Sequence, residues 1–274
     1  MNERLQKVLA AVGLASRREI ERWITAGRIT VNRKPAQLGM RVGDDDVIAL
    51  DGKRVHLGKN KKACRVLLYN KPEGQVSTRR DPDKRPTVYD RIPDKRERWM
   101  SVGRLDINTT GLLLFTNDGD LTHALTHPST GIDREYAVRV RGDIDEALLQ
   151  RLRDGVILED GFARFTDIQP GRDATGANKW FYVVLMEGKN REVRRLWESQ
   201  GVEVSRLKRV RFGNIFMPSS LQAGQYMELP PEDVNALREL AGLPAQAIDS
   251  APSSKRPARR NRRQVKRGRR TSSR

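Results

Sequence analysis

Hydrophobic positions near the start of the chain repeat every three or four residues. Leu5, Val8, Leu9 and Val12 follow the i, i+3, i+4, i+7 spacing of a short amphipathic helix, and Gly13 can end it. A second helix is predicted directly afterwards. Its apolar face consists of Ile20, Trp23 and Ile24. Ser16 and Glu19 have capping-box spacing at its start, and Gly27 lies where a helix-ending glycine belongs.

The pattern then changes from helical to extended. "RITVN" at 28–32 and "GDDDVIAL" at 43–50 predict two strands, and "GKRVHLGKNKK" at 52–62 predicts a linker. The first 58 residues or so therefore form one compact module.

From residue 64 onward the chain is rich in strand-like segments. These are 64–72, 99–105, 111–117, 134–140, 179–188 and 204–213, with helices predicted at 145–156 and 191–201. Strands and helices do not alternate strictly, which favours an α+β domain around a mixed, largely antiparallel sheet with flanking helices. Neither a dinucleotide-binding glycine motif nor a P-loop occurs, so a dehydrogenase or P-loop NTPase is not supported.

Composition places these elements in a globular, cytoplasmic protein. The chain has 274 residues, 37% of them hydrophobic, enough for one medium domain and one small one. The apolar runs are too short for a membrane span or a signal peptide. Cys64 is the one cysteine, so no disulfide framework is expected, and its apolar neighbours predict a core position.

Charge is concentrated at the C-terminal end. The formal net charge is +18, and residues 255–274 hold 11 lysines and arginines with no acid, which leaves +7 for the other 254 residues. Such a segment cannot bury a core and predicts a disordered arm that binds the phosphate backbone of a nucleic acid. A solubilising tail without a target is the alternative.

Histidine chemistry is poorly supported. His56 lies in the expected linker, and His123 and His127 have i, i+4 spacing but no further histidine or cysteine beside them. The pattern therefore predicts neither a metal site nor a hydrolytic triad. If the chain is an enzyme, carboxylate, Tyr, Lys and Arg side chains must do the chemistry.

Asp106 is the candidate carboxylate. It follows the strand expected at 99–105 and begins the turn "DINTTG", so it can point into a cleft, or it can simply bond backbone amides of its own turn. Arg17 and Arg18 at the start of the second helix oppose the helix dipole, which indicates an anion such as phosphate at that helix end. Ordinary surface arginines are the alternative.

Residues 3 to about 50 resemble the S4 RNA-binding domain in the order "RLQKVLAAVGLASRREIERWITAGRITVN". The resemblance implies that this helix pair binds structured RNA. The residues it places in contact with RNA are Arg4, Lys7, Arg17, Arg18, Arg22 and Arg28.

Four later motifs resemble, in order, those of pseudouridine synthases that modify ribosomal RNA and carry an S4 domain. They are "GRLD" at 103–106, "REYAV" at 134–138, "EGKNREVRRLW" at 187–197 and "SRLKRVRFG" at 205–213. The resemblance implies a catalytic set of Asp106, Tyr136, Arg194 and Leu207. It also implies an S4 domain at 1–60, a catalytic domain at 61–245 and a basic tail at 246–274.

The implied reaction isomerises uridine to pseudouridine without cofactor or metal. Asp106 serves as nucleophile or as base, Arg194 keeps it charged, and Tyr136 stacks on the detached base. The uridine must be flipped out of its stack. Contacts to the RNA backbone along the cleft are expected from Lys71, Arg104, Arg191, Arg195, Lys208, Arg209 and Arg211.

The basic extension and the segment "NKPEGQVSTRRDPDKRPTVYDRIP" at 70–93 most resemble the branch that modifies 23S rRNA of the large subunit near the peptidyl-transferase centre. A 16S rRNA synthase of the same family is one alternative. A non-catalytic RNA-binding ribosome-assembly factor is another. We expect a monomer that binds ribosomal RNA and no membrane.

Overall fold

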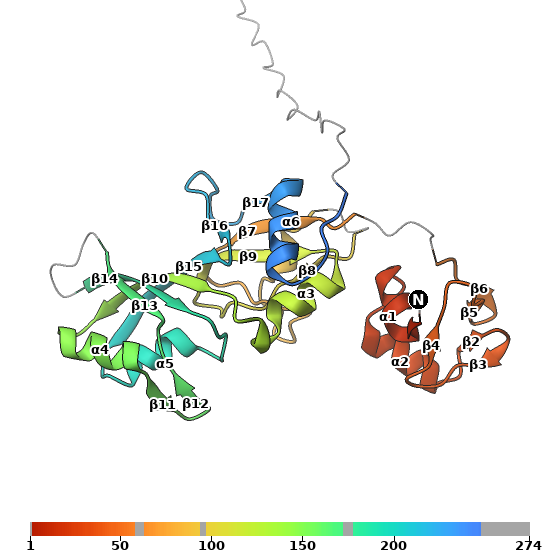
Figure 1. The fold of residues 1–274 in the computed structure, drawn as a ribbon, viewed down its shortest axis with the longest axis horizontal. Coiled ribbons are helices and arrows are strands. Elements are labelled where there is room, and N and C mark those ends of the chain that lie inside the picture. The colour runs from red at the N-terminus through yellow and green to blue at the C-terminus, as the bar shows by residue number, and fades with distance from the viewer. Residues whose placement is uncertain (1, 58–62, 94–96, 172–177, 248–274) are drawn as a thin grey trace, which may run out of the picture.

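The computed structural model describes residues 2–57, 63–93, 97–171 and 178–247. The basic segment 255–274 and residues 58–62 of the predicted linker lie outside the described residues. Lys53–Arg54, which were expected in that linker, form a strand instead. The chain forms a small N-terminal module, residues 2–57, and a larger domain, residues 63–247 (Figure 1). No helix in the described residues is long and apolar enough to cross a membrane.

In the N-terminal module two helices pack on a small sheet. The helices are α1 (Leu5–Ala11) and α2 (Arg17–Thr25). The sheet has the order β3-β2-β5-β6, with β2 (Ile29–Val31), β3 (Lys34–Pro35), β5 (Ile48–Leu50) and β6 (Lys53–Arg54). A short separate pair joins β1 (Glu3–Arg4) to β4 (Arg41–Val42). Helix and sheet side chains share one apolar core, which includes Leu5, Ile20 and Ile29.

Two local signals of the second helix have the predicted effect, and the capping box is half formed. Ser16 is the N-cap, and its Oγ accepts a hydrogen bond from the Glu19 amide at 3.1 Å. The Glu19 carboxylate pairs with Arg22 instead of returning to the Ser16 amide. Gly27 has φ +70° just beyond the helix, a left-handed conformation that glycine adopts without strain. The two helices and the strands of this module are thus confirmed.

The larger domain is built on a nine-stranded sheet of order β13-β14-β10-β15-β9-β7-β17, with β16 on β15 and β8 on β9. Its strands in chain order are β7 (Val66–Lys71), β8 (Met100–Ser101), β9 (Thr110–Thr116), β10 (Arg134–Arg141), β13 (Asp167–Pro170), β14 (Asn178–Leu185), β15 (Glu203–Phe212), β16 (Ile215–Phe216) and β17 (Tyr226–Glu228). Among the described strands of this sheet the β9–β15 pair is parallel and the other pairs are antiparallel. The predicted α+β class with a mixed, largely antiparallel sheet is confirmed.

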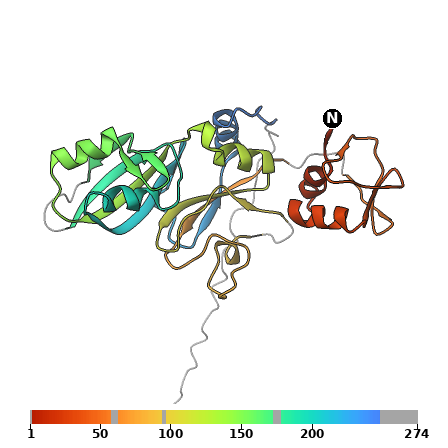
Figure 2. The same cartoon turned by 90° about the horizontal axis from the view of Figure 1, so that it is seen from below.

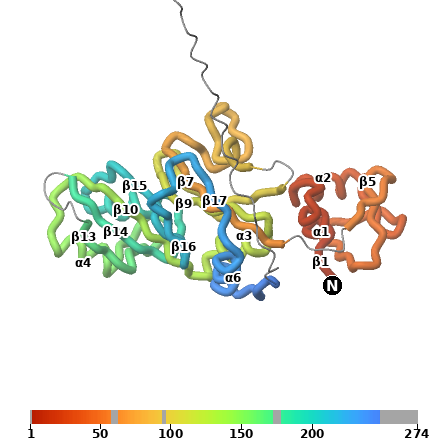
Figure 3. Tube along the Cα trace, turned by 90° about the horizontal axis from the view of Figure 1, so that it is seen from above, coloured from red at the N-terminus to blue at the C-terminus, as the bar shows by residue number. Residues whose placement is uncertain are grey.

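Helices cover both faces of this sheet. Because side chains alternate along a strand, Leu113 and Phe115 of β9 join a core with α4 (Glu146–Asp154) and α5 (Glu192–Glu198). Leu112 and Leu114 join a second core with α3 (Gly119–Thr126) and α6 (Pro231–Leu240). Burial on both faces explains the unbroken apolar run "LLLF". Figures 1 and 3 both place α3 and α6 close together.

Several segments differ from the sequence-based expectation. The strand predicted at 99–105 is limited to Met100–Ser101, because Gly103 turns the chain with φ +73°. Asp106 therefore follows a bend rather than a strand. The hairpin of β11 (Val156–Leu158) and β12 (Gly161–Ala163), and the helices α3 and α6, were not predicted. Two short 3₁₀ turns, Val88–Asp90 and Pro128–Thr130, complete the described elements.

Candidate active site

A cavity of about 480 Å³ opens beside the β10–β15 pair of the larger domain. Its lining from these two strands consists of Arg134, Tyr136, Leu207 and Arg209. Tyr136 lies directly across from Arg209, which explains why the two side chains share one face. The loop around Asp106 forms part of the rim, and the loop 186–191 forms another part. Three residues of the expected catalytic set, Asp106, Tyr136 and Leu207, thus line one cavity.

Asp106 begins a tight turn in which its carbonyl accepts a hydrogen bond from the Thr109 amide at 3.0 Å. The side chain is half-buried and lines the cavity. Among the described residues no hydrogen bond or ion pair engages its carboxylate, so the carboxylate is not used to bond the amides of its own turn. Asp118 and Asp145, by contrast, bond backbone amides at helix starts. The Asp106 carboxylate is therefore open to a ligand in the cavity.

Two buried cations hold the backbone of this turn. The Lys71 ammonium donates to the carbonyls of Ile107 at 3.3 Å, Thr109 at 2.8 Å and Pro72 at 3.1 Å. The Arg194 guanidinium donates through Nη2 to the Asn108 carbonyl at 3.1 Å. Consecutive carbonyls of the turn are therefore bound to positive charge, which fixes the direction in which Asp106 points.

Lys71 departs most clearly from the sequence-based expectation. Its side chain is fully buried, so its ammonium cannot contact an RNA backbone, and it bonds the Asp106 turn instead. Burial lowers the pKa of Lys71 to about 8, although the nearby carboxylates of Asp106 and Glu73 raise it.

Arg194 acts on Asp106 through the backbone rather than through a direct ion pair. Besides the bond to Asn108, its Nη1 donates to the Val204 carbonyl at 2.8 Å, and no ion pair with Asp106 occurs among the described contacts. Burial lowers the pKa of Arg194 and the charge of Arg191 lowers it further, whereas Asp106 raises it. Asp106 and Arg194 are thus close enough to interact electrostatically. Arg194 belongs to α5 and is not among the described residues that line the cavity.

An aromatic ring organises two further arginines in the cavity. The guanidinium carbons of Arg134 and Arg209 each lie 5.3 Å from the centroid of Phe212. Arg209 is 3% exposed, and its Nε donates to the Leu112 carbonyl at 2.7 Å. It therefore lines the cleft along which it was expected, but as a buried residue of the pocket wall. Sequence reasoning missed Arg134, although its position two residues before Tyr136 on the same strand places it on the same face.

The other basic residues expected along the cleft separate into two groups. Arg104 and Arg191 line the cavity, and the exposed Arg104 has no described partner. Arg195 is bound in a two-bond ion pair with Asp160, and Arg211 is paired with Glu135 and Asp133. Lys208 is half-buried on β15. The paired residues are less available to RNA than the sequence suggested.

The N-terminal module carries a separate groove, which is lined by Arg4, Arg18 and Arg22 together with the helix-bridging pair of Gln6 and Glu21. The remaining RNA-contact candidates of this module lie elsewhere. Lys7 pairs with Glu3 and with Asp120, both at 2.9 Å. Arg28 pairs with Asp51 and stacks on Trp23. Arg17 lies close to Gly119 of α3.

Cys64 is buried and its Sγ lies 3.5 Å from the Thr116 hydroxyl, so its predicted core position is confirmed. The rings of His123 and His127 lie against each other with centroids 5.5 Å apart. No group of three or more His, Cys, Asp or Glu side chains suited to a metal ion occurs in the described part of the chain.

Family models match both parts of the chain. Residues 65–199 match the model described as RNA pseudouridylate synthase, and residues 3–48 match the S4 domain. "Ribosomal large subunit pseudouridine synthase B" of Pseudomonas aeruginosa is 55% identical over 253 residues, which are 90% of this chain and 65% of that protein. The proteins of the same name from Vibrio cholerae and Haemophilus influenzae are 56% and 53% identical, covering 89% and 93% of this chain and 76% and 73% of theirs.

A solved structure shares the fold. The crystal structure of a pseudouridylate synthase aligns with a TM-score of 0.60 at 24% identity, covering 86% of this chain and 99% of that one.

Proposed function

The chain belongs to the RNA pseudouridylate synthase family, with an S4 domain at its N-terminal end, and from this premise we propose that it isomerises a uridine of 23S ribosomal RNA, near the peptidyl-transferase centre, to pseudouridine. The N-terminal module is its S4 domain and the larger domain is its catalytic domain. One observation supports the chemistry above the others. The Asp106 carboxylate has no protein partner among the described residues and faces a cavity lined by an aromatic and an aliphatic side chain, Tyr136 and Leu207.

The reaction needs a carboxylate next to the ribose. The N1–C1′ bond of uridine breaks, the uracil turns, a C5–C1′ bond forms, and the proton on C5 is lost while N1 gains one. Asp106 assists either as a nucleophile at the sugar or as a base that removes a ribose proton. Either role requires an ionised, precisely directed carboxylate, and Lys71 and Arg194 direct it by binding the turn carbonyls.

The detached uracil must be held while it turns. Tyr136 offers a ring on which the base stacks, and Leu207 packs beside it as the apolar contact. Arg134 and Arg209 are fixed against Phe212, so their positive charge is in place before the reaction starts. We propose that this charge favours the phosphate groups that flank the flipped nucleotide.

Flipping a uridine out of its stack costs a few kcal/mol, which binding elsewhere must offset. The groove cations Arg4, Arg18 and Arg22 of the S4 domain and the basic segment 255–274 are the proposed sources of that binding. Arg104 and Arg191 at the cavity rim are the proposed backbone contacts nearest the target. We propose that the protein acts as a monomer in the cytoplasm.

The function is tested by mapping pseudouridines in rRNA from cells that lack the gene, and from the same cells given wild-type protein or Asp106→Asn. We expect one site in 23S rRNA to disappear and to return with wild-type protein alone. Loss of a site in 16S rRNA instead would show that the substrate is 16S rRNA and not 23S rRNA. An unchanged map with defective subunit assembly would favour a non-catalytic assembly factor.

Asp106→Asn separates chemistry from binding in vitro. The amide keeps the shape of the carboxylate but supplies neither a nucleophile nor a base, so we expect no pseudouridine above background. Because no described residue bonds the Asp106 carboxylate, the substitution breaks no described contact, and RNA affinity should remain within about twofold, which is under 0.5 kcal/mol. Full activity of this variant would remove Asp106 from the mechanism.

A further inference from the structure

We propose that Arg98, together with the Lys7–Asp120 ion pair, docks the S4 domain in a fixed position on the catalytic domain, so that the enzyme selects RNA by the separation between the element in the S4 groove and the target uridine. Arg98, Lys7 and Asp120 are positioning residues in this scheme. The identity of the substrate rests on the proposed function, whereas the docking rests on contacts within the protein.

Arg98 connects the catalytic domain to the loop between the two S4 helices. Its Nη1 donates to the Ala10 carbonyl at 2.9 Å and to the Ala15 carbonyl at 2.6 Å. The last turn of α1 contains no basic residue of its own, so its carbonyl end lacks a cation. The Ala10 carbonyl also accepts a hydrogen bond from the Gly13 amide at 3.1 Å. Arg98 supplies the cation from the other domain, at a helix end where the dipole favours positive charge.

A second contact lies beside the first. The Lys7 ammonium of α1 is 2.9 Å from Asp120, which lies in the first turn of α3. Arg17 lies near the same end of α3. A Cβ added to Gly119 would be 4.0 Å from Nη2 of Arg17. In all three views the helices of the S4 domain, rather than its sheet, are on the side of the catalytic domain (Figures 1, 2 and 3).

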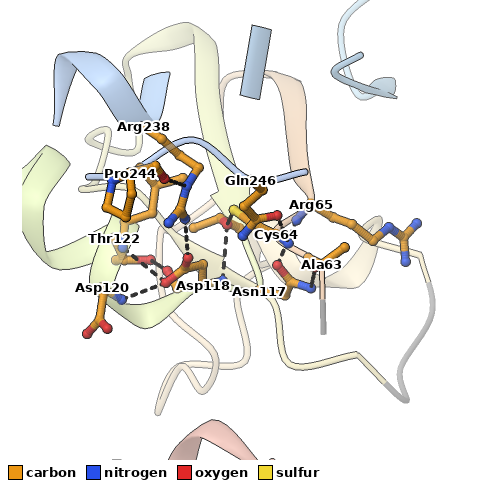
Figure 4. Close-up of polar contacts among 12 residues, drawn as sticks. Ala63, Cys64, Arg65, Asn117, Asp118, Asp120, Thr122, Arg238, Pro244 and Gln246 are labelled. Carbon is orange, nitrogen blue, oxygen red and sulfur yellow. Dashed lines mark hydrogen bonds and ion pairs between the residues drawn. The ribbon is translucent and has the colours of Figure 1, made fainter. Parts of the chain in front are cut away.

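The helix that receives these contacts is itself firmly held. Asp118 is the N-cap of α3 and accepts hydrogen bonds from the amides of Asp120 and Leu121. Its other oxygen is 2.6 Å from Nη1 of Arg238 on α6, and Arg238 also donates to the Pro244 carbonyl (Figure 4). Burial raises the pKa of Asp118, but the two amides and Arg238 outweigh it, so the pKa lies below its usual value. The carboxylate therefore stays ionised and bonded near neutral pH.

The first and last described residues of the catalytic domain lie together beside α3. The Cys64 amide donates to the side chain of Gln246 at 2.7 Å (Figure 4). Asn117 accepts from the Arg65 amide and donates to the Ala63 carbonyl. The first described residues after the S4 domain are thus fixed next to α3. Helix α3 is therefore firmly held within the catalytic domain, and the contacts of Arg98 and of Lys7 with Asp120 define the position of the S4 domain relative to it.

Docking leaves the RNA-binding groove open. The contacts use Lys7 and the carbonyls of Ala10 and Ala15, whereas the groove is lined by Arg4, Arg18 and Arg22. The helix pair therefore has one set of residues for the catalytic domain and another for a ligand. A fixed groove and a fixed cavity together favour only those RNAs that place two elements at the matching distance.

Docking is tested first without RNA. Spin labels on Lys34→Cys in the S4 domain and Glu232→Cys on α6 report the distance between the domains, since both positions are exposed and Cys64 is buried. We expect a narrow distance distribution in the otherwise wild-type protein and a broad one in Arg98→Ala. Arg91→Ala, an exposed arginine of the catalytic domain, is the control and should leave the distribution narrow. A distribution that Arg98→Ala does not change would overturn the proposal.

A charge swap distinguishes the ion pair from a general loss of stability. Lys7→Glu should broaden the distribution, and adding Asp120→Lys should narrow it again, because the pair is restored with opposite polarity. Lys53→Glu makes the same charge change at an exposed site of the S4 domain and should have no effect. Broadening by Lys53→Glu, or failure of the second substitution to narrow the distribution, would contradict the role of the pair.

The functional consequence is measured on two RNAs. One is a long 23S fragment, and the other is a short stem-loop that carries only the target uridine. For Arg98→Ala we expect KM to rise about tenfold on the long RNA with kcat unchanged, and neither to change on the short one. Equal effects on both RNAs would contradict the docking role and show that Arg98 acts by stabilising the catalytic domain itself. If wild-type protein modifies neither RNA, the proposed function fails, and the distance measurement still decides the docking.

Discussion

Asp106 and Lys71 meet opposite electrostatic demands at one turn. The Asp106 carboxylate is half-buried and must stay available to a ligand. The Lys71 ammonium is fully buried and donates its hydrogen bonds to backbone carbonyls. Withdrawing a lysine charge from water is unfavourable, and its lowered pKa of about 8 records that cost. The cost is offset by an ordered turn that directs Asp106.

The lowered pKa of Lys71 predicts a pH dependence. In the unfolded chain its pKa is near 10.5, so between pH 8 and 10.5 the unfolded state binds more protons and the Lys71 contribution to the free energy of unfolding rises with pH, by about 3 kcal/mol in all. Activity should behave oppositely. The ammonium donates three hydrogen bonds and the neutral amine only two, so we expect kcat to fall with a midpoint near pH 8.

The control for this fall in kcat, the descending limb of the pH profile, is Lys71→Met, which fills the same space without a titrating group. It should be about tenfold or more slower at pH 7, because charge-assisted hydrogen bonds to the turn are lost. Its rate should show no descending limb near pH 8 in single-turnover assays. Identical pH profiles for the wild type and Lys71→Met would assign the limb to another group.

Arg194→Lys tests the second cation. A guanidinium reaches the Val204 and Asn108 carbonyls with two nitrogens, and an ammonium cannot span both. Loss of one such bond should lower the single-turnover rate by about 10- to 100-fold and leave the RNA dissociation constant unchanged. Arg195→Lys is the matched control on the same helix, since its ion pair with Asp160 lies at the surface, and it should cost less than about threefold.

At this scale the sequence was informative about residue types and less so about their surroundings. The motifs indicated Asp106, Tyr136 and Leu207, and the structure brings them to one cavity. Lys71 was expected to contact the RNA backbone along the cleft, because a charge after "VLLYN" gives no sign of whether the strand's end is covered. Arg134 has no distinctive spacing of its own, and its place depends on pairing with strands far along the chain. The catalytic and RNA-contact assignments stay predictions.

Among the elements, the parallel β9–β15 pair brings the turn of Asp106 next to the strand of Leu207 and Arg209. The pair forms at Thr110–Gly111 and Lys208–Arg209, where the backbones approach closely. Gly111 has φ +100°, and a Cβ there would lie 2.2 Å from the Arg209 carbonyl oxygen. Only glycine allows this approach, so one residue decides whether the two halves of the site meet.

Gly111→Ala should therefore destabilise the catalytic domain strongly. The left-handed backbone and the displaced strand together predict a loss of about 3 kcal/mol or more in the free energy of unfolding, measured by urea denaturation. Gly74→Ala is the control. Its φ of +84° is similar, but nothing lies within 4 Å of an added Cβ, so we expect about 1–2 kcal/mol. Equal losses would show that the backbone angle alone matters.

Elements with local signals were predicted well. Ser16 and Gly27 mark the ends of α2, and the long apolar strands β7, β9, β10, β14 and β15 follow from their patterns. The strand at 99–105 failed because Gly103 bends the chain where the apolar residues Val102 and Leu105 still face the core. Helix α6 was missed although Pro231 stands at its first position, where proline is favoured.

At the scale of the whole molecule, an S4 domain precedes the catalytic domain. The motifs predicted the S4 module, the α+β domain and their order, and these are confirmed by the fold and the family models. The position of the S4 domain was not predictable, because it depends on single charged residues such as Arg98 and Asp120 that belong to no motif. The exact domain boundaries stay predictions.

The basic segment 255–274 makes its own prediction for the intact protein. It holds 11 of the 53 lysines and arginines, and each phosphate that it neutralises should add about 0.7–0.9 to the slope of log affinity against log salt concentration. If about five of these charges contact RNA, deleting the segment should flatten the slope by about four and weaken binding at low salt most. The rate at saturating RNA should stay the same, because the cavity residues are untouched. A full-length variant with the 11 cations replaced by glutamine separates charge from chain length, and it should match the deletion. A slope that neither change alters would mean that the segment does not lie on the RNA, and the S4 groove would then have to supply the binding that offsets base flipping.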